Sequence, residues 1–466
     1  MDQPTPDLHP TLRCTKVRVV ILLALAVIGY AWMLRHYTSP FAGGSDSSGY
    51  LNSAALLRDG RLVAPVRVVP GHTAEEFGTR THQPLGFNVR EGSEVMVPTY
   101  PIGLPLHLLA FAPFVGLDWA AIPLNLVTAL AGGFLFYVFG RRLGLSEALA
   151  GGGAALLLAS PLYLFAAFQP LSDLLALVWS TLALLLALRA REGKFWALAC
   201  GAAVAVAVLV RPTNLLLVGP VALALGLDWR RYLWVGLGGL PGALLVVGYN
   251  RQVYGSPFAT GYGSIAPDFG FRYVWPNVWY FARWIPGLSS PLVVAALAAP
   301  FVSALRRREA AVLASWAVLL IAFYAFYVYA GEGWWYLRFI LPAFPALLLL
   351  ALVTLQAVTG DAAARVERSG SVARGARADV GHQPVPPTKG AWLQSRGIHL
   401  RRSRRLGPHP PAAERHRRRH AGERRAILLH RFRHRPVGQD RARARRATPQ
   451  SAAGATESDH CCALRL

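Results

Sequence analysis

The chain has 466 residues, of which 54% are hydrophobic and only 15% are charged, and its mean hydropathy is +0.35. This composition excludes an ordinary soluble globular protein and predicts a polytopic membrane protein. The formal net charge of +24 is unevenly distributed, because residues 1–360 contribute +8 and the much shorter segment 361–466 contributes +16. The chain therefore divides near Gly360 into a hydrophobic part and a basic tail.

Membrane-spanning segments dominate the hydrophobic part. A helix needs about 20 mostly apolar residues to cross a bilayer. Ten segments approach or meet this requirement: 17–35, 119–140, 147–166, 173–189, 195–211, 214–228, 232–250, 287–305, 310–330 and 339–358. We therefore expect an all-α membrane domain of about ten transmembrane helices over residues 17–358, preceded by a cytoplasmic N-terminus at 1–16.

The topology depends on an eleventh apolar segment, 101–116. If this segment does not cross the membrane, four clusters of basic residues all lie on the cytoplasmic side, as the positive-inside rule requires, whereas a crossing would export all four. We therefore interpret 101–116 as an interfacial or re-entrant helix on the outer face. Three sizeable outer loops follow from this arrangement, at 37–118, 251–286 and 331–338.

Asp46 is the most informative residue of the first outer loop. It follows the first span by about ten residues, in a turn rich in glycine and serine, and Tyr50 lies four residues later on a helix predicted to run to Asp59. A carboxylate just outside a membrane helix can serve an enzyme that acts on a lipid-borne substrate. The structural alternative is an ordinary solvated aspartate in a loop.

A second acid, Asp173, begins the fourth span after the sequence Gln-Pro-Leu-Ser. A carboxylate at the bilayer centre costs about 3 kcal/mol, so this interfacial position is energetically acceptable. Asp173 can be a functional acid, or it can cap the helix, because Ser or Asp before an apolar run stabilises a helix start by about 1 kcal/mol. Both interpretations remain open at this point.

Two arginines lie on the predicted outer face, against the usual charge bias. Arg211 stands in an Arg-Pro-Thr turn between the fifth and sixth spans, and Arg338 immediately precedes the last span. A guanidinium group is well suited to bidentate binding of phosphate, so both residues are candidates for binding an anion. For Arg211 the alternative is a side chain that extends along the helix end into the interface.

Aromatic residues gather in the same outer loops. Tyr254 and Tyr262 flank a turn rich in glycine and proline, and Trp335 lies three residues before Arg338. Aromatic belts are normal at membrane interfaces, and this explanation is strong for the tryptophans. Stacked aromatic rings are equally the groups that bind sugar rings.

In this order, the residues resemble those of the GT-C-fold integral membrane glycosyltransferases, especially the bacterial relatives of the dolichyl-phosphate-mannose protein mannosyltransferases and the aminoarabinose transferase. The resemblance covers about residues 17–358. It rests on an acidic motif with a following Tyr and helix at 46–60, Tyr-Pro-x-Gly-x-Pro-Leu at 100–106, Gln-Pro-x-Ser-Asp at 169–173, Arg-Pro-Thr at 211–213, Tyr-Gly-Ser-Pro-x-x-Thr-Gly-Tyr at 254–262 and Arg-Phe-x-Leu-Pro-x-x-Pro at 338–345. The usual acidic pair is here a single aspartate followed by Ser47, which argues against a two-carboxylate or metal-assisted variant. The family also often continues with further spans or an outer domain, and we expect neither in this chain.

The resemblance implies transfer of a sugar from a polyprenyl-phosphate donor to a glycan, lipid or protein acceptor, with inversion, on the outer (periplasmic) side of the cytoplasmic membrane. Asp46 would be the general base, and Arg211 and Arg338 would neutralise the departing lipid phosphate. Asp173 would orient the acceptor or a supporting arginine. The remaining expected substrate-binding residues are Tyr50, Tyr254, Tyr262 and Trp335. Membrane lipid is an expected partner and nucleic acid is not. No cofactor and no metal ligand is assigned, and dependence on a divalent metal stays open.

A polytopic transporter or lipid flippase is the alternative function. It would place ionisable residues at mid-bilayer and show matched halves of the sequence. This chain instead concentrates its acidic residues in one outer loop and has no internal inverted repeat.

The tail, at 359–466, differs chemically from the rest. Residues 361–466 contain 23 arginines, one lysine and eight histidines. Such a basic segment with few apolar residues cannot bury a core, so we expect it to be disordered. One hypothesis is a cytoplasmic arm for anionic lipid or RNA. The other is a frameshifted reading of a GC-rich gene, which would leave the activity of the chain open.

Overall fold

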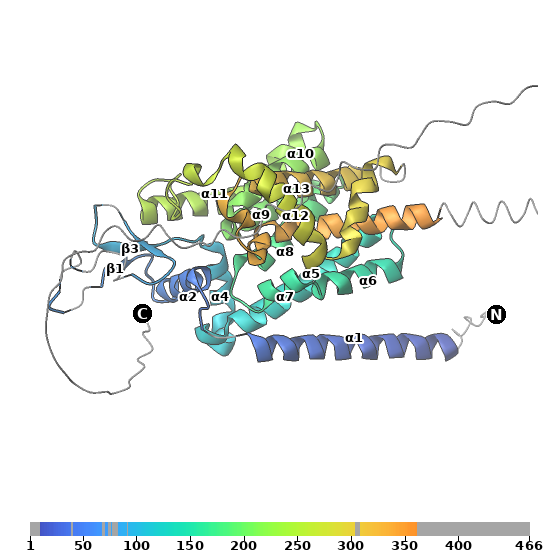
Figure 1. Ribbon diagram of the computed structural model, residues 1–466, viewed down its shortest axis with the longest axis horizontal. Coiled ribbons are helices and arrows are strands. Elements are labelled where there is room, and N and C mark those ends of the chain that lie inside the picture. The colour runs from blue at the N-terminus through green and yellow to red at the C-terminus, as the bar shows by residue number, and fades with distance from the viewer. Residues whose placement is uncertain are drawn as a thin grey trace, which may run out of the picture. The chain divides into compact units, whose positions relative to one another are not determined.

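The computed structural model describes residues 10–360 except 39–40, 68–69, 73–75, 77–82, 91 and 303–307, with side chains from residue 20 onward. The tail, with its predicted disorder and both hypotheses about it, lies outside the described residues. The described chain is built mainly from helices (Figure 1), which confirms the predicted class of an all-α, multi-pass membrane protein.

The α-helices are α1 (Pro10–Tyr37), α2 (Ser45–Arg58), α4 (Gly103–Val115), α5 (Ala121–Arg142), α6 (Glu147–Leu158), α7 (Pro161–Ala167), α8 (Ser172–Arg189), α9 (Lys194–Val210), α10 (Val218–Leu225), α11 (Trp229–Tyr254), α12 (Val274–Leu288) and α13 (Arg308–Ala325). The 3-10 helices are Leu117–Trp119, Pro212–Leu217, Ala266–Asp268, Phe271–Tyr273, Pro291–Phe301, Val328–Gly331 and Trp334–Ala343. The last of these continues into an α-helical segment, so that Trp334–Gly360 forms one long apolar helix.

Six helices of the described residues are long and apolar enough to cross a membrane, or eight if each of two bent helix pairs counts as one span. Nine of the ten predicted spans correspond to seven of these eight and to two shorter apolar segments, Lys194–Val210 and Pro212–Leu225. The tenth, 287–305, matches only Pro291–Phe301, the second helix of a pair bent by 115°, and the first helix of that pair, Phe271–Leu288, lies almost wholly in the predicted loop 251–286. At 1.5 Å per residue the shorter segments reach only about 20–25 Å, less than the roughly 30 Å hydrocarbon core. The number of crossings therefore stays a prediction.

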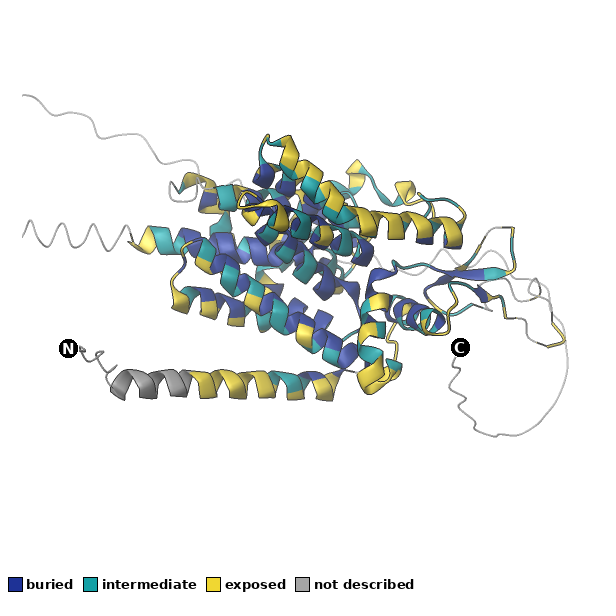
Figure 2. Cartoon of the chain, turned by 180° about the vertical axis from the view of Figure 1, so that it is seen from behind, coloured by how far each residue is buried: buried dark blue, intermediate teal, exposed yellow. Residues whose placement is uncertain are grey.

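Burial distinguishes the central helix from the peripheral ones. In α8, 72% of the apolar window is buried, whereas the corresponding share in α1 and in α11 is 6%. Figure 2 shows buried positions concentrated in the middle of the helical bundle and exposed positions along most of the described part of α1. Lipid tails are as apolar as leucine, so α1 and α11 can expose leucine to a bilayer at no cost.

Close packing of α9 against α11 fixes the position of α9. A Cβ atom added at Gly201 would lie 1.9 Å from the carbonyl oxygen of Val235, and one added at Gly238 would lie 2.0 Å from that of Leu198. Only glycine permits this approach of two helix backbones, a common device between membrane helices. The contact matters for the site because Arg211 follows α9 directly.

The segment predicted to be the first outer loop contains α2, α4 and a small antiparallel sheet (Figure 1). Helix α4 agrees with the helix expected at 101–116, and its 13 residues reach about 20 Å, too short to cross a bilayer. The strands β1 (Ala64–Pro65), β2 (Phe87–Val89) and β3 (Val95–Pro98) pair in the order β1-β3-β2. The sequence did not predict this sheet.

Candidate functional site

Helix α2 presents the first acid of the site. The predicted helix at Tyr50–Asp59 is longer in the structure and begins at Ser45, so Asp46 lies in its first turn, where the helix dipole favours a carboxylate. The Asp46 side chain is 27% exposed. One turn later, Tyr50 is buried, and its hydroxyl donates a hydrogen bond to Ser172 Oγ at 2.9 Å. This bond ties the start of α2 to the start of α8.

Asp173 lies in the first turn of α8 and is only 1% exposed. Its Oδ1 forms an ion pair with Arg211 Nη1 at 2.6 Å, although the angle is unsuitable for a hydrogen bond. Its Oδ2 accepts a hydrogen bond from Arg338 Nη1 at 3.4 Å. The alternative of a helix cap is wrong, because the capping residue is Leu171 and no side chain caps this helix start. Asp173 instead holds two guanidinium groups.

Arg211 reaches the site because a proline ends α9. Pro212 excludes the helical conformation at the residue before it, and Arg211 is extended, with φ −153° and ψ 113°. Pro212 then starts the next helix, where its missing N–H costs nothing. The Arg211 side chain, 12% exposed, turns toward Asp173.

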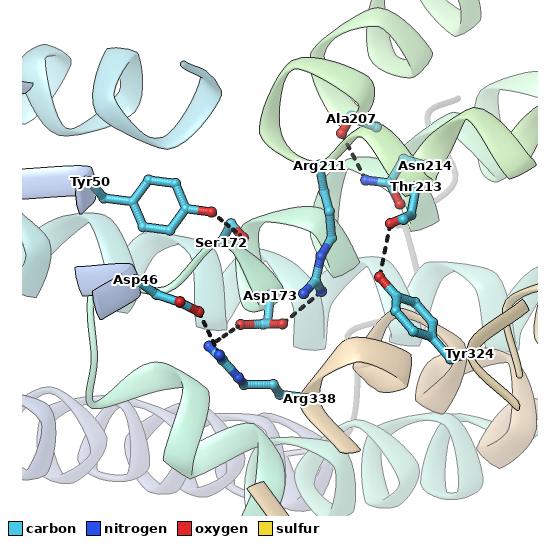
Figure 3. A network of polar contacts seen from close by, with 10 residues as sticks. All are labelled: Asp46, Tyr50, Ser172, Asp173, Ala207, Arg211, Thr213, Asn214, Tyr324 and Arg338. Carbon is cyan, nitrogen blue, oxygen red and sulfur yellow. Dashed lines mark hydrogen bonds and ion pairs between the residues drawn. The ribbon is translucent and has the colours of Figure 1, made fainter. Parts of the chain in front are cut away.

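Arg338 connects the two acids. It lies in the 3-10 helix Trp334–Ala343, and its Nη2 donates to Asp46 Oδ2 while its Nη1 donates to Asp173. Figure 3 shows the resulting chain of alternating charges, from Asp46 through Arg338 and Asp173 to Arg211. The guanidinium carbons of both arginines lie near the ring of Phe339, at 5.2 Å from its centroid for Arg211 and 5.3 Å for Arg338. One aromatic ring thus supports both cations.

The charges alter the acidity of groups around this network. Burial is the largest single influence on the pKa of the Arg211 guanidinium and lowers it. The Asp173 carboxylate and the nearby tyrosines together raise this pKa by more, so Arg211 stays charged. Burial and then the nearby Asp46 carboxylate raise the pKa of Tyr50 and of Tyr100 above the ordinary tyrosine value. Both tyrosines are therefore neutral O–H donors at physiological pH.

The two acids differ in their freedom to change partners. Asp173 is fully enclosed and contacts two arginines, whereas Asp46 is partly exposed and contacts one. A buried carboxylate between two cations is costly to displace, but an ion pair at the edge can exchange for another anion. Chemically, the arrangement offers two preorganised guanidinium groups and one carboxylate that can be released from them.

Besides Tyr50, the three other predicted aromatic residues lie in different places. The Tyr254 hydroxyl donates to the carbonyl of Pro98 at 2.9 Å, and the Tyr262 ring lies 6.0 Å from that of Tyr100, whose hydroxyl donates to Ser45. Tyr254 and Tyr262 also line a cavity of about 120 Å³. Trp335 is 44% exposed and packs on its neighbours Trp334 and Tyr336, not on the charged network.

Sequence reasoning missed three residues that the structure brings into the site. Ser172 accepts from Tyr50, Phe339 lies beside both arginines, and Tyr100 stacks near Tyr50 with ring centroids 5.1 Å apart. Ser172 and Phe339 are sequence neighbours of predicted site residues, and all three stand in the motifs that carry the family resemblance, which is the signal that could have indicated them. Metal binding stays untested, although no group of three or more His, Cys, Asp or Glu within the described part of the chain could hold a metal ion.

No protein-family model matches the chain, and no curated protein matches it. Two solved structures do, both of ArnT from Cupriavidus metallidurans. The structure bound to undecaprenyl phosphate matches with a TM-score of 0.51 and 18% identity, over 72% of this chain and 60% of that one. The apo structure matches with a TM-score of 0.52 and 18% identity, over 74% and 60%. The chain therefore spans about 60% of the length of these structures, and it shares the GT-C fold that its sequence resemblance predicted.

Proposed function

We propose that the chain is a polyprenyl-phosphate-sugar-dependent glycosyltransferase that acts at the outer face of the cytoplasmic membrane. The observation that supports this proposal best is the pair of arginines held by Asp173 beside the less confined carboxylate of Asp46. The fold adds support, because ArnT from Cupriavidus metallidurans was solved with undecaprenyl phosphate, a polyprenyl phosphate.

Donor binding begins at the arginines. The phosphate of the donor accepts hydrogen bonds from Arg338 and Arg211 and competes with Asp46 for Arg338. Asp173 keeps both guanidinium groups in place during this exchange, because it is buried between them. When the sugar–phosphate bond breaks, the leaving phosphate gains negative charge, which the two preorganised cations stabilise.

Asp46, once released, acts as the general base. It removes the proton from the acceptor hydroxyl while the acceptor oxygen attacks the anomeric carbon. The bond from that carbon to the phosphate oxygen breaks, and polyprenyl phosphate leaves. A single displacement of this kind inverts the anomeric configuration. The acceptor is a hydroxyl-bearing glycan, lipid or protein of the cell envelope.

The sugar lies among the tyrosines in this proposal. Tyr50, Tyr100 and Tyr262 form a chain of ring contacts next to Asp46, and their rings and hydroxyls suit a sugar that offers both an apolar face and polar edges. Tyr254 positions the loop between α11 and Tyr262 through its bond to Pro98. Trp335 is exposed enough to contact the membrane interface or the acceptor.

Release of polyprenyl phosphate in lipid nanodiscs, from a panel of lipid-linked sugars with candidate acceptors, tests the proposal. We expect release by the wild type, loss of at least about 100-fold in Asp46→Asn, and an inverted product by NMR. Asp59→Asn is the matched control, since Asp59 caps the C-terminal end of α2 and pairs, among the described residues, with the exposed Arg58 and Arg61. Equal release by Asp46→Asn and wild type would exclude Asp46 as the base. Movement of the lipid-linked sugar across the membrane without release would favour the flippase alternative.

A further inference from the structure

A groove runs between α5 and α8, far from the charged network. Its volume is about 610 Å³, within the range of sites that bind small molecules. The walls are apolar and come from α5, with Phe134 and Val138, and from α8, with Leu182 and Leu186. The groove opens to the surface of the helical bundle, because Phe134 is 65% exposed. In a bilayer this surface faces acyl chains.

Three arginines line the end of this groove. Arg141 and Arg142 are the last residues of α5, and Arg189 is the last residue of α8. Trp196, from the first turn of α9, completes the end, and the Arg189 guanidinium lies 4.8 Å from its ring centroid. The site therefore combines an apolar trough with a cationic head.

Helix capping accounts for only part of this cluster. Arg141 donates to the carbonyl of Leu145, and Arg142 donates to that of Leu188, so each satisfies a carbonyl near a helix end. The Nε of Arg142, however, is buried and has no hydrogen-bond partner among the described residues. Arg189 has no carboxylate within ion-pair distance in the same part of the chain.

The nearby carboxylates do not neutralise the positive charge of the three arginines. Glu147 lies 3.8 Å from Arg141 and Glu192 lies 3.7 Å from Arg142, and these carboxylates are 80% and 52% exposed. Pairs this loose and this exposed are weak and leave the guanidinium groups available to a stronger anion. Phosphate is such an anion, because it can accept several charge-assisted hydrogen bonds at once.

The position of the groove along α8 matches a membrane interface. Along α8, Asp173 and Arg189 are about 24 Å apart at 1.5 Å per residue, not far below the thickness of a hydrocarbon core. The arginines therefore lie at the interface opposite the charged network, where the predicted topology places the cytoplasm. Basic pockets between transmembrane helices on that side suit anionic lipid headgroups.

We propose that this groove binds one anionic phospholipid of the opposite leaflet from the charged network. Its acyl chain lies between α5 and α8, and its headgroup phosphate contacts Arg141, Arg142 and Arg189. This lipid is neither donor nor acceptor, and the proposal does not depend on the transferase reaction.

Native mass spectrometry of the full chain in detergent tests the proposal, with phosphatidylglycerol, phosphatidylcholine and inorganic phosphate added separately. We expect one phosphatidylglycerol to bind in clear preference to phosphatidylcholine, and inorganic phosphate not to displace it. Each arginine should contribute about fivefold in affinity, so Arg141→Gln/Arg189→Gln should lose about 25-fold. Arg230→Gln is the matched control, because Arg230 also lies over a tryptophan, Trp229, but does not line the groove.

A second pair of variants tests the apolar part without removing charge. Val138→Trp fills the groove and should abolish the preference for phosphatidylglycerol, whereas Val127→Trp, at an exposed position of α5 outside the groove, should keep it. Thermal unfolding of each variant verifies folding, and Val138→Trp remains a test if the double arginine variant does not fold. Equal binding of both phospholipids, or equal loss in Arg230→Gln or Val127→Trp, would overturn the proposal.

Discussion

The two ends of α8 carry charged residues that differ in burial and in ion pairing. At its first turn, Asp173 is 1% exposed and contacts two arginines from distant parts of the sequence. At its last turn, Arg189 is exposed, lies over Trp196, and has no carboxylate partner within the described residues. A charge buried inside the protein needs partners supplied by the protein, whereas a charge at the edge can take a partner from outside. The first arrangement positions groups, and the second is open to a ligand.

The largest expected effect on stability and activity comes from removing the carboxylate of Asp173 at the buried end of α8. Asp173→Asn leaves two buried guanidinium groups without their shared carboxylate, which should destabilise the protein by about 3–5 kcal/mol and abolish transfer. Arg189→Gln, at the open end of the same helix, should change the free energy of unfolding by less than about 0.5 kcal/mol. Thermal unfolding in detergent without added phospholipid compares the two. Similar losses in both variants would contradict the distinction between the two ends.

Arg338→Lys should have the next largest effect. A lysine ammonium is a point charge without the fork of a guanidinium, so it cannot serve Asp46 and Asp173 together. We expect kcat to fall about 100-fold, as for the loss of one preorganised donor. Arg283→Lys controls for the substitution itself, because Arg283 is exposed and lies over Trp284. An unchanged kcat in Arg338→Lys would show that bridging the two acids is unimportant.

Tyr50→Phe should cost about 1 kcal/mol of stability, the net value of one buried hydrogen bond. The ring stays in place, so only the bond from the Tyr50 hydroxyl to Ser172 is lost. A double-mutant cycle with Ser172→Ala isolates this contact, and the two losses should be clearly less than additive. Strict additivity would mean that the bond does not couple α2 to α8.

The smallest expected effect is a pH dependence of stability that arises from His107, which contacts Trp179 in the middle of α8. His107 on α4 accepts a hydrogen bond from the Trp179 indole through Nε2 at 3.1 Å, and its Nδ1 donates to the carbonyl of Gly103 at 2.7 Å. Burial lowers the pKa of His107, so the folded protein favours the neutral ring. The unfolded chain, with an ordinary pKa near 6.5, takes up this proton first.

Stability from this contact should therefore be fully present above about pH 6.5 and be lost as the pH falls toward the lowered pKa. Unfolding of the wild type measured at several pH values, with His107→Asn as reference, tests this expectation. The difference between the two proteins should shrink on acidification. A difference that is constant between pH 5 and 8 would show that the ring does not titrate differently on folding.

Local sequence signals were sufficient for much of the fold. The apolar segments predicted the helices because hydrophobicity and length are local properties. Pro212 predicted the break that ends α9, since proline acts on its immediate neighbours. The sheet of the first outer loop was not predictable, because strands of two to four residues carry too little periodicity to distinguish them from a loop.

The charged residues of the candidate site were named from the sequence, but their contacts were not. Asp46, Asp173, Arg211 and Arg338 were identifiable because charges are rare and costly beside membrane spans. Their pairing was not, since Arg338 reaches Asp46 across 292 positions of sequence. Asp173 illustrates the limit, because a Ser-Asp pair before an apolar run is also the signature of a helix cap.

The sequence by itself determined that this is a helical membrane protein, roughly where its helices lie, and which charged residues are unusual. Hydrophobic length and backbone propensity act within a few residues, so they can be read along the chain. Only the tertiary structure decided that Asp173 is enclosed between two arginines, that Asp46 is the freer acid, and that Phe339 supports both cations. Burial and ion pairing depend on contacts between helices that are distant in the sequence, and no local sequence pattern predicts those contacts.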